Sequence, residues 1–188
     1  MELSKYVGLA CVTESIVPEI DGMDSRVLHG LTGMCTESGE ILDAFKKHFW
    51  YGKELDKVNI LEEIGDLCWY LAILTDALDL DFAELVEKAI AHNDSQDERP
   101  LFSIASEFNA ICGGNLVTMT TAGVPHMVEP LFFLVDEMII EMDGKWEEIC
   151  EVNIAKLTAR YGDKFDAHKA LNRDLETERE ILDTGLGG

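Results

Sequence analysis

The sequence predicts an all-α protein, organised as a helical bundle in a single domain over residues 1–188. Apolar residues recur at helical spacing in the long segments of the chain, and polar stretches with glycine or proline separate these segments. A chain of 188 residues has the usual size of one domain and buries roughly 70% of its unfolded surface. Because 47% of the residues are apolar, the chain can fill a hydrophobic core, and general disorder is not expected.

Four helices are predicted in the first half of the chain. Their expected ranges are about 4–16, 24–48, 59–78 and 81–92. Side chains that accept hydrogen bonds from the first backbone N–H groups of a helix stand at three of these starts: Asp24 or Ser25, Asn59 and Asp81. The short basic link that follows the second helix contains a glycine and would fold the second and third helices into an antiparallel pair.

The middle of the chain is expected to be less regular. Residues 93–100 read as a polar connection, and a short helix is predicted over residues 103–112. Gly113 and Gly114 are expected to stop that helix, because glycine is common just after a helix C-terminus. The segment 115–125 is rich in threonine, glycine and valine, which predicts a loop that can include a short strand.

Three helices are predicted in the last third of the chain. The first is expected to start at Pro130, since proline suits the first turn of a helix, where its missing N–H group would have no partner. It is expected to end near residue 142, where Asp143 and Gly144 turn the chain. The other two are expected at about 146–161 and 173–182.

The second and third helices each carry two acidic residues three positions apart, Glu37 with Glu40 and Glu63 with Asp66. Residues at i and i+3 share a helix face, so each pair points in one direction. Each pair also borders the apolar stripe of its helix. If the two acidic margins face each other, four carboxylates converge at the rim of the bundle core.

Such a convergence needs a compensating charge. Two like charges about 4 Å apart repel by roughly 4 kcal/mol at an effective dielectric constant of about 20. Four carboxylates beside apolar residues would therefore share protons or hold a cation, and hard oxygen ligands suit Mg²⁺ or Mn²⁺. The alternative interpretation is that these acids form the solvated flank of two amphipathic helices. Spacing alone does not decide between the two.

The net charge of −22 disfavours nucleic acid and anionic membranes as partners, because either would be repelled. A phosphate-containing substrate would have to arrive with metal ions or meet a local basic patch. Five cysteines without a CxxC spacing predict a reduced, cytoplasmic protein. No secretory signal is visible, and the longest apolar run, residues 67–74, is far shorter than the roughly 18 residues of a membrane span. A soluble protein is therefore expected.

A local basic cluster is predicted on the helix over residues 146–161. Asn153, Lys156 and Arg160 occur at i, i+3 and i+7, on one face, within the pattern NxxKLxxRY. An amide, an ammonium and a guanidinium together could hold a phosphate. The alternative is a solvent-facing helix end, where basic side chains interact favourably with the helix dipole.

Together these motifs resemble the MazG-like nucleoside triphosphate pyrophosphohydrolases, which belong to the all-α NTP pyrophosphatase superfamily. The ExxE pair, the ExxD pair and NxxKLxxRY carry the resemblance. The words around them are similar to those of phage and bacterial members: ESGEILDAFKKHFWYGK, NILEEIGDLCWYLAIL and RYGDKFDAHKALNRDLETEREIL. The resemblance covers about residues 27–92 and 146–183. Residues 94–145 fall outside it and are expected to form a helical or loop insertion.

The resemblance implies hydrolysis of a nucleoside triphosphate between its α and β phosphates, giving a nucleoside monophosphate and pyrophosphate. The four acids would be the catalytic Mg²⁺ ligands, with Mn²⁺ as an alternative metal. Lys156 and Arg160 would stabilise the phosphates, and Asn153 would donate a hydrogen bond to phosphate or sugar. Lys47, two turns beyond Glu40, would reach the same anion, and Lys53 is a weaker candidate.

Two more residues near the acids have open roles. Tyr70, one turn beyond Asp66, would either pack on the sugar or base or close the core with its ring. Glu62 lies about 100° around the helix from Glu63 and is interpreted as a surface acid in preference to a catalytic base.

The expected protein is thus a homodimer or homotetramer that hydrolyses deoxynucleoside triphosphates in a nucleotide-pool or housecleaning role. The alternative is a non-catalytic helical interaction or regulatory protein that retains the fold. A ferritin-like di-metal oxidase is disfavoured because no glutamate is followed by histidine three residues later. A P-loop enzyme is disfavoured because the chain has no GxxxxGK[ST] motif.

Overall fold

The computed structural model describes residues 1–93, 99–118 and 123–187, and this part of the chain is all-α, as predicted. Its nine helices are α1 (Leu3–Val12), α2 (Ser25–Tyr51), α3 (Lys57–Ala77), α4 (Phe82–Asn93), α5 (Leu101–Thr118), α6 (Val124–Glu141), α7 (Trp146–Tyr161), α8 (Ala167–Leu171) and α9 (Leu175–Leu186). None of the described helices is both long and apolar enough to cross a lipid bilayer.

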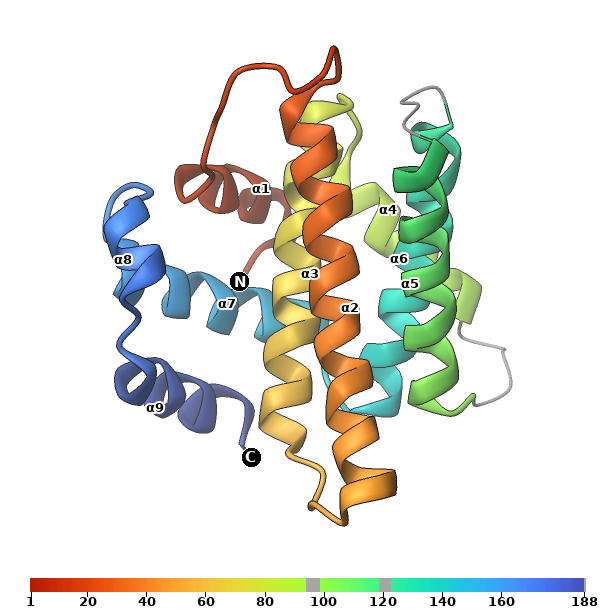
Figure 1. Cartoon of the computed structure of the whole chain (residues 1–188), viewed down its shortest axis with the longest axis vertical. Coiled ribbons are helices and arrows are strands. Elements are labelled where there is room, and N and C mark those ends of the chain that lie inside the picture. The colour runs from red at the N-terminus through yellow and green to blue at the C-terminus, as the bar shows by residue number, and fades with distance from the viewer. Residues whose placement is uncertain (94–98, 119–122, 188) are drawn as a thin grey trace.

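The long antiparallel pair α2 and α3 forms the centre of the bundle (Figure 1). On one side, α5 packs against α2, and α6 packs against α3, α4 and α5. On the other side, α1, α7 and α9 pack against α3, and α9 also packs against α7. Thirteen of the 21 residues of α3 are buried, because helices cover α3 on several sides.

A side chain caps each of α2 and α3. The prediction of Asp24 at α2 is confirmed, whereas that of Asn59 at α3 is wrong, because α3 already begins at Lys57. The Asp24 carboxylate accepts hydrogen bonds from the N–H groups of Arg26 and Val27. At α3 the capping residue is Asp56, which accepts from the N–H of Asn59. A capping side chain of this kind stabilises a helix by about 1 kcal/mol. The caps therefore contribute to the register of the two helices that carry the acidic pairs.

Packing outweighs the helix-stop signal of two glycines in α5. The sequence prediction that Gly113 and Gly114 stop a helix is wrong, because α5 continues through both to Thr118. Glycine inside a helix costs only about 1 kcal/mol, and the buried Phe108 and Cys112 hold α5 against its neighbours. The first helix is shorter than predicted and ends at Val12.

The prediction that a helix starts at Pro130 is also wrong. Helix α6 begins at Val124 and contains Pro130 in its interior. Buried Val124, Met127 and Val128 extend the helix ahead of the proline, which shows that core contacts outweigh the local cost of proline.

The segment outside the family resemblance is helical where the structure describes it. Helices α5 and α6 place Phe108 and Phe132 in the fully buried core. Residues 94–98 of the predicted connection and 119–122 of the predicted loop lie outside the described residues. Residues 115–118 belong to α5, contrary to the loop prediction. Near the C-terminus, α8 was not predicted, and the last helix starts at Leu175.

Candidate functional site

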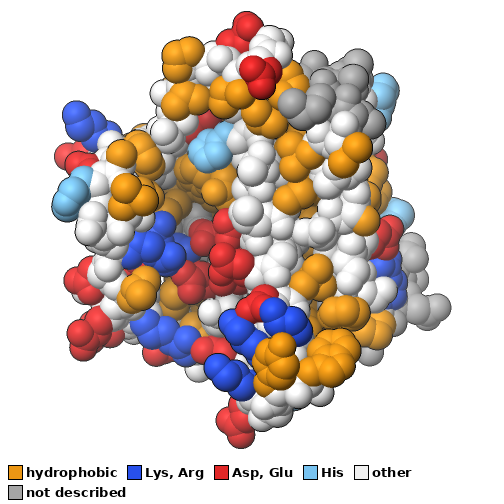
Figure 2. All heavy atoms as spheres, in the orientation of Figure 1, with side chains coloured by type: hydrophobic (Ala, Val, Ile, Leu, Met, Phe, Trp, Pro, Cys, Tyr) orange, Lys and Arg blue, Asp and Glu red, His pale blue; other side chains and the backbone are white. Residues whose placement is uncertain are grey.

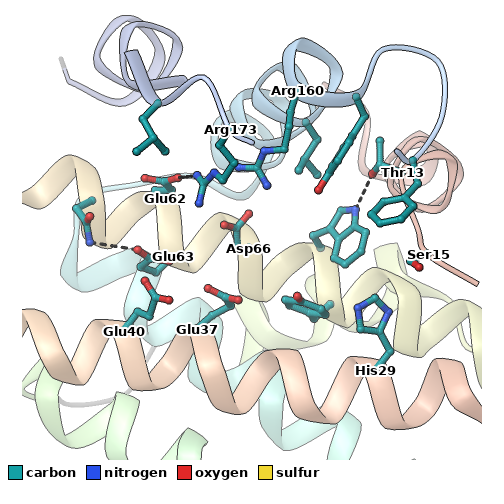
Figure 3. Close-up of a pocket in the computed structure, with 17 residues that line it drawn as sticks. Thr13, Ser15, His29, Glu37, Glu40, Glu62, Glu63, Asp66, Arg160 and Arg173 are labelled. Carbon is teal, nitrogen blue, oxygen red and sulfur yellow. Dashed lines mark hydrogen bonds and ion pairs between the residues drawn. The ribbon is translucent and has the colours of Figure 1, made fainter. Parts of the chain in front are cut away.

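A cavity of about 470 Å³ lies between the α2–α3 pair and the C-terminal segment of the chain. Figure 2 shows acidic side chains gathered in this hollow, with Lys and Arg side chains along the C-terminal side and apolar side chains at one end. The close-up shows acids projecting from α2 and α3, and arginines extending over them from the opposite side (Figure 3). The pocket thus has an acidic wall, a basic wall and an aromatic end.

The acidic wall carries the four acids that the sequence singles out. Carboxylate oxygens of Glu37, Glu63 and Asp66 all lie within 4.8 Å of one another. Glu40 lines the same pocket but is exposed and lies outside this close group. The antiparallel arrangement of α2 and α3 turns the two i, i+3 pairs toward each other, so three acids form a compact group and the fourth lies at its edge.

The electrostatics of the acidic wall favour a cation. Burial raises the pKa of Glu63 to about 9, with further increases from the charges of Asp66, Glu40 and Glu37. Burial likewise raises the pKa of Glu37 to about 7, again with the charges of Asp66 and Glu40. Asn59 donates one hydrogen bond to Glu63 over 3.2 Å. Without a cation, protons must therefore neutralise part of this group at neutral pH.

Asp66 differs from its neighbours because helix α7 neutralises it. Lys156 donates to both of its carboxylate oxygens, over 2.8 and 2.7 Å, and Asn153 donates to one of them over 2.7 Å. Tyr6 donates in turn to the Asn153 amide oxygen. Helix α7 passes close to α3 at Gly65, where an added Cβ would be in van der Waals contact with the Asn153 side chain, at 3.4 Å. Asp66 is thus held in one orientation, with an ammonium as its partner.

Asn153 and Lys156 consequently lie behind Asp66 instead of on the pocket wall. Lys156 is 0% exposed and Asn153 is 3% exposed, so the alternative prediction of a solvent-facing helix end is wrong for both. Burial lowers the pKa of Lys156, but the charges of Asp66 and Glu62 outweigh burial, and the pKa is raised overall. Lys156 is therefore a buried cation that compensates the acidic wall.

The interpretation of Glu62 as a surface acid is also wrong. Its side chain is only 16% exposed, and it accepts from Lys156 over 3.2 Å and from Arg173 over 3.4 Å. Helix α7 and the connection before α9 cover this face of α3. The periodicity of α3 alone contains no information about these later segments, so the sequence reasoning assigned Glu62 to solvent.

The basic wall consists of Arg160 from α7 and Arg173 from the connection between α8 and α9. Arg160 was predicted, whereas Arg173 was not. Both donate to one buried carboxylate, Glu178 of α9. The pKa of Glu178 is lowered, because these two bonded guanidiniums outweigh its burial. The only sequence signal for Arg173 was its place within the C-terminal words of the resemblance.

Aromatic rings line the end of the pocket beyond the acids. His29 packs edge-on against Trp69 and Tyr70, with ring centroids 5.8 and 5.5 Å apart, and Tyr161 contacts Phe165 at 5.3 Å. All five residues line the cavity. Burial lowers the pKa of His29, which favours its neutral form. Of these five, only Tyr70 was predicted to line the site; Tyr161 belongs to the NxxKLxxRY pattern, but no role was predicted for it.

Tyr70 is partly buried against α2, where its neighbour is Gly33. A Cβ at Gly33 would lie 2.1 Å from the Tyr70 ring, so only glycine leaves room for the ring there. Burial raises the pKa of Tyr70, so its hydroxyl stays protonated. The ring both packs against α2 and lines the pocket, which combines the two roles that the sequence left open.

The structure does not bring Lys47 into this pocket. Lys47 pairs with Asp43 over 2.6 Å and lines a neighbouring cavity of about 520 Å³ together with Lys53. The two cavities share Glu40 and Asn59 as lining residues. Lys47 extends the acidic stripe along α2, as expected, but turns toward the link between α2 and α3.

Comparison of the chain with protein-family models, with curated protein sequences and with solved structures found no match. Any assignment of function therefore depends on the chemistry of the pocket and on the sequence motifs.

Proposed function

We propose that this protein is a Mg²⁺-dependent nucleoside triphosphate pyrophosphohydrolase of the MazG-like type. The substrate is a nucleoside triphosphate, preferably a deoxynucleotide, and the products are the nucleoside monophosphate and pyrophosphate. The observation that carries the proposal is the group formed by Glu37, Glu63 and Asp66, whose oxygens lie within 4.8 Å of one another in a pocket with arginines and aromatic rings on its other sides.

The donor set fits a hard divalent cation. The close group offers only carboxylate oxygens, which Mg²⁺ and Mn²⁺ prefer over softer metals that select sulfur or imidazole. Burial, together with the charges of the neighbouring acids, raises the pKa values of Glu37 and Glu63, so the group favours a bound cation or protons. Bound Mg²⁺ would neutralise phosphate charge and lower the pKa of an attacking water. Glu37, Glu40, Glu63 and Asp66 would be its ligands.

The remaining residues of the pocket would bind different parts of the substrate. Tyr70 and its aromatic neighbours present flat apolar surface for a base or sugar, and Arg160 presents a guanidinium for a phosphate. Asn153 and Lys156 hold Asp66 in place and balance its charge, which is a supporting role instead of the direct phosphate contact that the resemblance implies. Lys47 remains a candidate for an anion only through the neighbouring cavity.

The motif resemblance supports the same function. The ExxE, ExxD and NxxK motifs occur in the expected order. The acids of the first two motifs line one pocket, and Asn153 and Lys156 donate to Asp66 from behind it. Within this proposal the protein acts in the cytoplasm as a homodimer or homotetramer and removes unwanted nucleotides from the pool. The alternative, a non-catalytic interaction or regulatory protein, would need neither the metal nor the triphosphate.

Pyrophosphate release tests the proposal. Purified protein would be incubated with each of the common deoxynucleoside and ribonucleoside triphosphates in Mg²⁺, in Mn²⁺ and in a chelator. We expect metal-dependent release of one pyrophosphate per nucleoside monophosphate from at least one substrate. Absence of pyrophosphate from every triphosphate in both metals would contradict the proposal and favour the non-catalytic alternative.

A further inference from the structure

We infer that Arg173 binds the phosphate chain of the substrate and that Glu178 is the residue that positions it, so the segment at the start of α9 completes the site. This inference rests on the proposed function. It assigns a role to two residues that neither the helical periodicity nor the acidic and basic motifs single out.

The position of Arg173 provides the first step. Arg173 precedes α9, far in sequence from the acids, yet its side chain reaches over the pocket opposite the carboxylates (Figure 3). It is 38% exposed, so its guanidinium is accessible from the cavity. In a chain with a net charge of −22, a phosphate group needs such a local positive charge to approach.

The partners of Arg173 show that it is held but not saturated. Glu178, whose side chain is only 4% exposed, accepts from its Nε over 3.0 Å and from its Nη2 over 2.5 Å. The contact from Nη2 to Glu62 is 3.4 Å, which is long for a bond between charges. Nη1 of Arg173 donates to no other residue in the described part of the chain. An incoming anion can therefore bind at Nη1 of Arg173 while Glu178 keeps the guanidinium in its orientation.

Glu178 holds two guanidiniums with one charge. It also accepts from Nε and Nη2 of Arg160, over 2.7 and 2.8 Å. Arg26, Arg99 and Arg179 each contact two carboxylates that no other arginine of the described chain contacts. Among the described residues, Arg160 and Arg173 are the arginines that share one buried carboxylate, and Arg173 has only the long contact to Glu62 besides. Glu178 therefore fixes both guanidiniums opposite the candidate metal ligands.

The chemistry of this pair fits a phosphate better than a sugar or a base. A guanidinium presents parallel N–H donors that match two oxygens of one phosphate. The arginines lie across the pocket from Glu37, Glu63 and Asp66, so the same phosphate chain could contact cations on both sides. A hydrogen bond between charged groups is worth about tenfold in affinity or more.

The test uses Arg173→Gln, with Arg179→Gln as the matched control. Arg179 also belongs to the α9 region, but it pairs with Asp56 and Asp183 and does not line the cavity. The probe is inorganic tripolyphosphate, which needs no base recognition, titrated calorimetrically into the magnesium-loaded full-length protein. We expect Arg173→Gln to weaken binding about tenfold or more, Arg173→Lys to recover part of the loss, and Arg179→Gln to change the affinity by less than about twofold.

Kinetics and a Glu178 variant complete the test. Glu178→Gln should raise KM for the nucleoside triphosphate more than it lowers kcat, because it frees the arginines without touching the reacting atoms. Thermal melting of each variant checks that the comparison is made on folded protein. If Arg173→Gln binds tripolyphosphate and turns over the nucleoside triphosphate as well as the wild type does, the inference is overturned and the proposed function stays intact. Equal losses in Arg173→Gln and Arg179→Gln would also overturn it. If the wild-type protein cleaves no nucleoside triphosphate, both the proposed function and this inference are contradicted.

Discussion

The two walls of the pocket handle charge in opposite ways. On the acidic wall, Glu37 and Glu63 lie beside other carboxylates, and their pKa values rise to about 7 and about 9. On the basic wall, Glu178 is bonded to two guanidiniums, and its pKa falls. Glu63 and Glu178 are both buried, at 6% and 3% exposed, so burial alone does not explain the contrast. The difference lies in whether the protein itself supplies the counter-charge.

This contrast separates stabilising charges from functional ones. Removing one partner of a buried ion pair costs much stability, because the remaining charge stays desolvated. A crowd of like charges destabilises the fold until something from solution neutralises it. Substitutions on the two walls should therefore change stability in opposite directions.

The largest expected effect is the loss of the buried ammonium between the walls. Lys156→Met would leave Asp66 without its counter-charge and Glu62 with only the 3.4 Å contact to Arg173. This is expected to destabilise the metal-free protein by about 3–5 kcal/mol. Urea unfolding measures this loss. The control is Lys145→Met. The Lys145 side chain is 69% exposed and pairs with Glu148 at the surface, so its loss should cost less than about 1 kcal/mol. Similar losses in both variants would contradict a special role for Lys156.

Removal of a ligand from the acidic wall should affect turnover instead. Glu63→Gln is expected to lower kcat/KM by about 100-fold or more, since the metal site loses one of its charged oxygens. The free energy of unfolding of the metal-free protein should stay the same or increase at pH 7, because the raised pKa of Glu63 keeps the wild-type side chain mostly protonated there. Steady-state kinetics and urea unfolding measure the two quantities. Unchanged turnover would remove Glu63 from the site.

A smaller effect is expected when pH charges the acidic wall. The folded pKa of Glu63, about 9, lies above its unfolded value, so the folded state binds more protons between these pH values and stability falls as pH rises. The metal-free wild type is therefore expected to lose stability steadily between pH 5 and pH 9.

Two comparisons make the pH experiment specific. Saturating Mg²⁺ should reduce the pH-dependent loss, because the cation replaces the protons. Glu63→Gln should also reduce it, since that position no longer titrates. A wild-type stability that rises from pH 5 to pH 9 in the absence of metal would contradict the raised pKa values.

The smallest expected effect concerns the aromatic end. Gly33→Ala would push a Cβ into the Tyr70 ring, 2.1 Å away, and is expected to cost about 1–2 kcal/mol and to weaken nucleotide binding. Gly39→Ala is the control on the same helix, because nothing lies within 4 Å of its added Cβ. That variant should gain about 0.5–1 kcal/mol from helix propensity. Melting temperatures and nucleotide affinity would show whether Tyr70 contacts the substrate.

Features that depend on neighbouring residues in the chain could be predicted from the sequence. The i, i+3 pairs Glu37–Glu40 and Glu63–Asp66 define one face of a helix from spacing alone, and the short link brings the two helices side by side. Reasoning failed where distant segments cover a residue. Glu62 and Lys156 lie on helices that the sequence predicts, yet their burial depends on α7, α9 and the connection between them.

By itself, then, the sequence determined the helical class, most of the helices and the acidic residues that border the core, because these follow from repeats a few residues long. The tertiary structure alone decided which charges are compensated. It placed Lys156 behind Asp66, brought Arg173 and Glu178 across from the acids, and carried α5 and α6 through Gly113 and Pro130. The physical reason is that desolvation and ion pairing depend on every group that surrounds a charge, and those groups come from segments far apart in the chain.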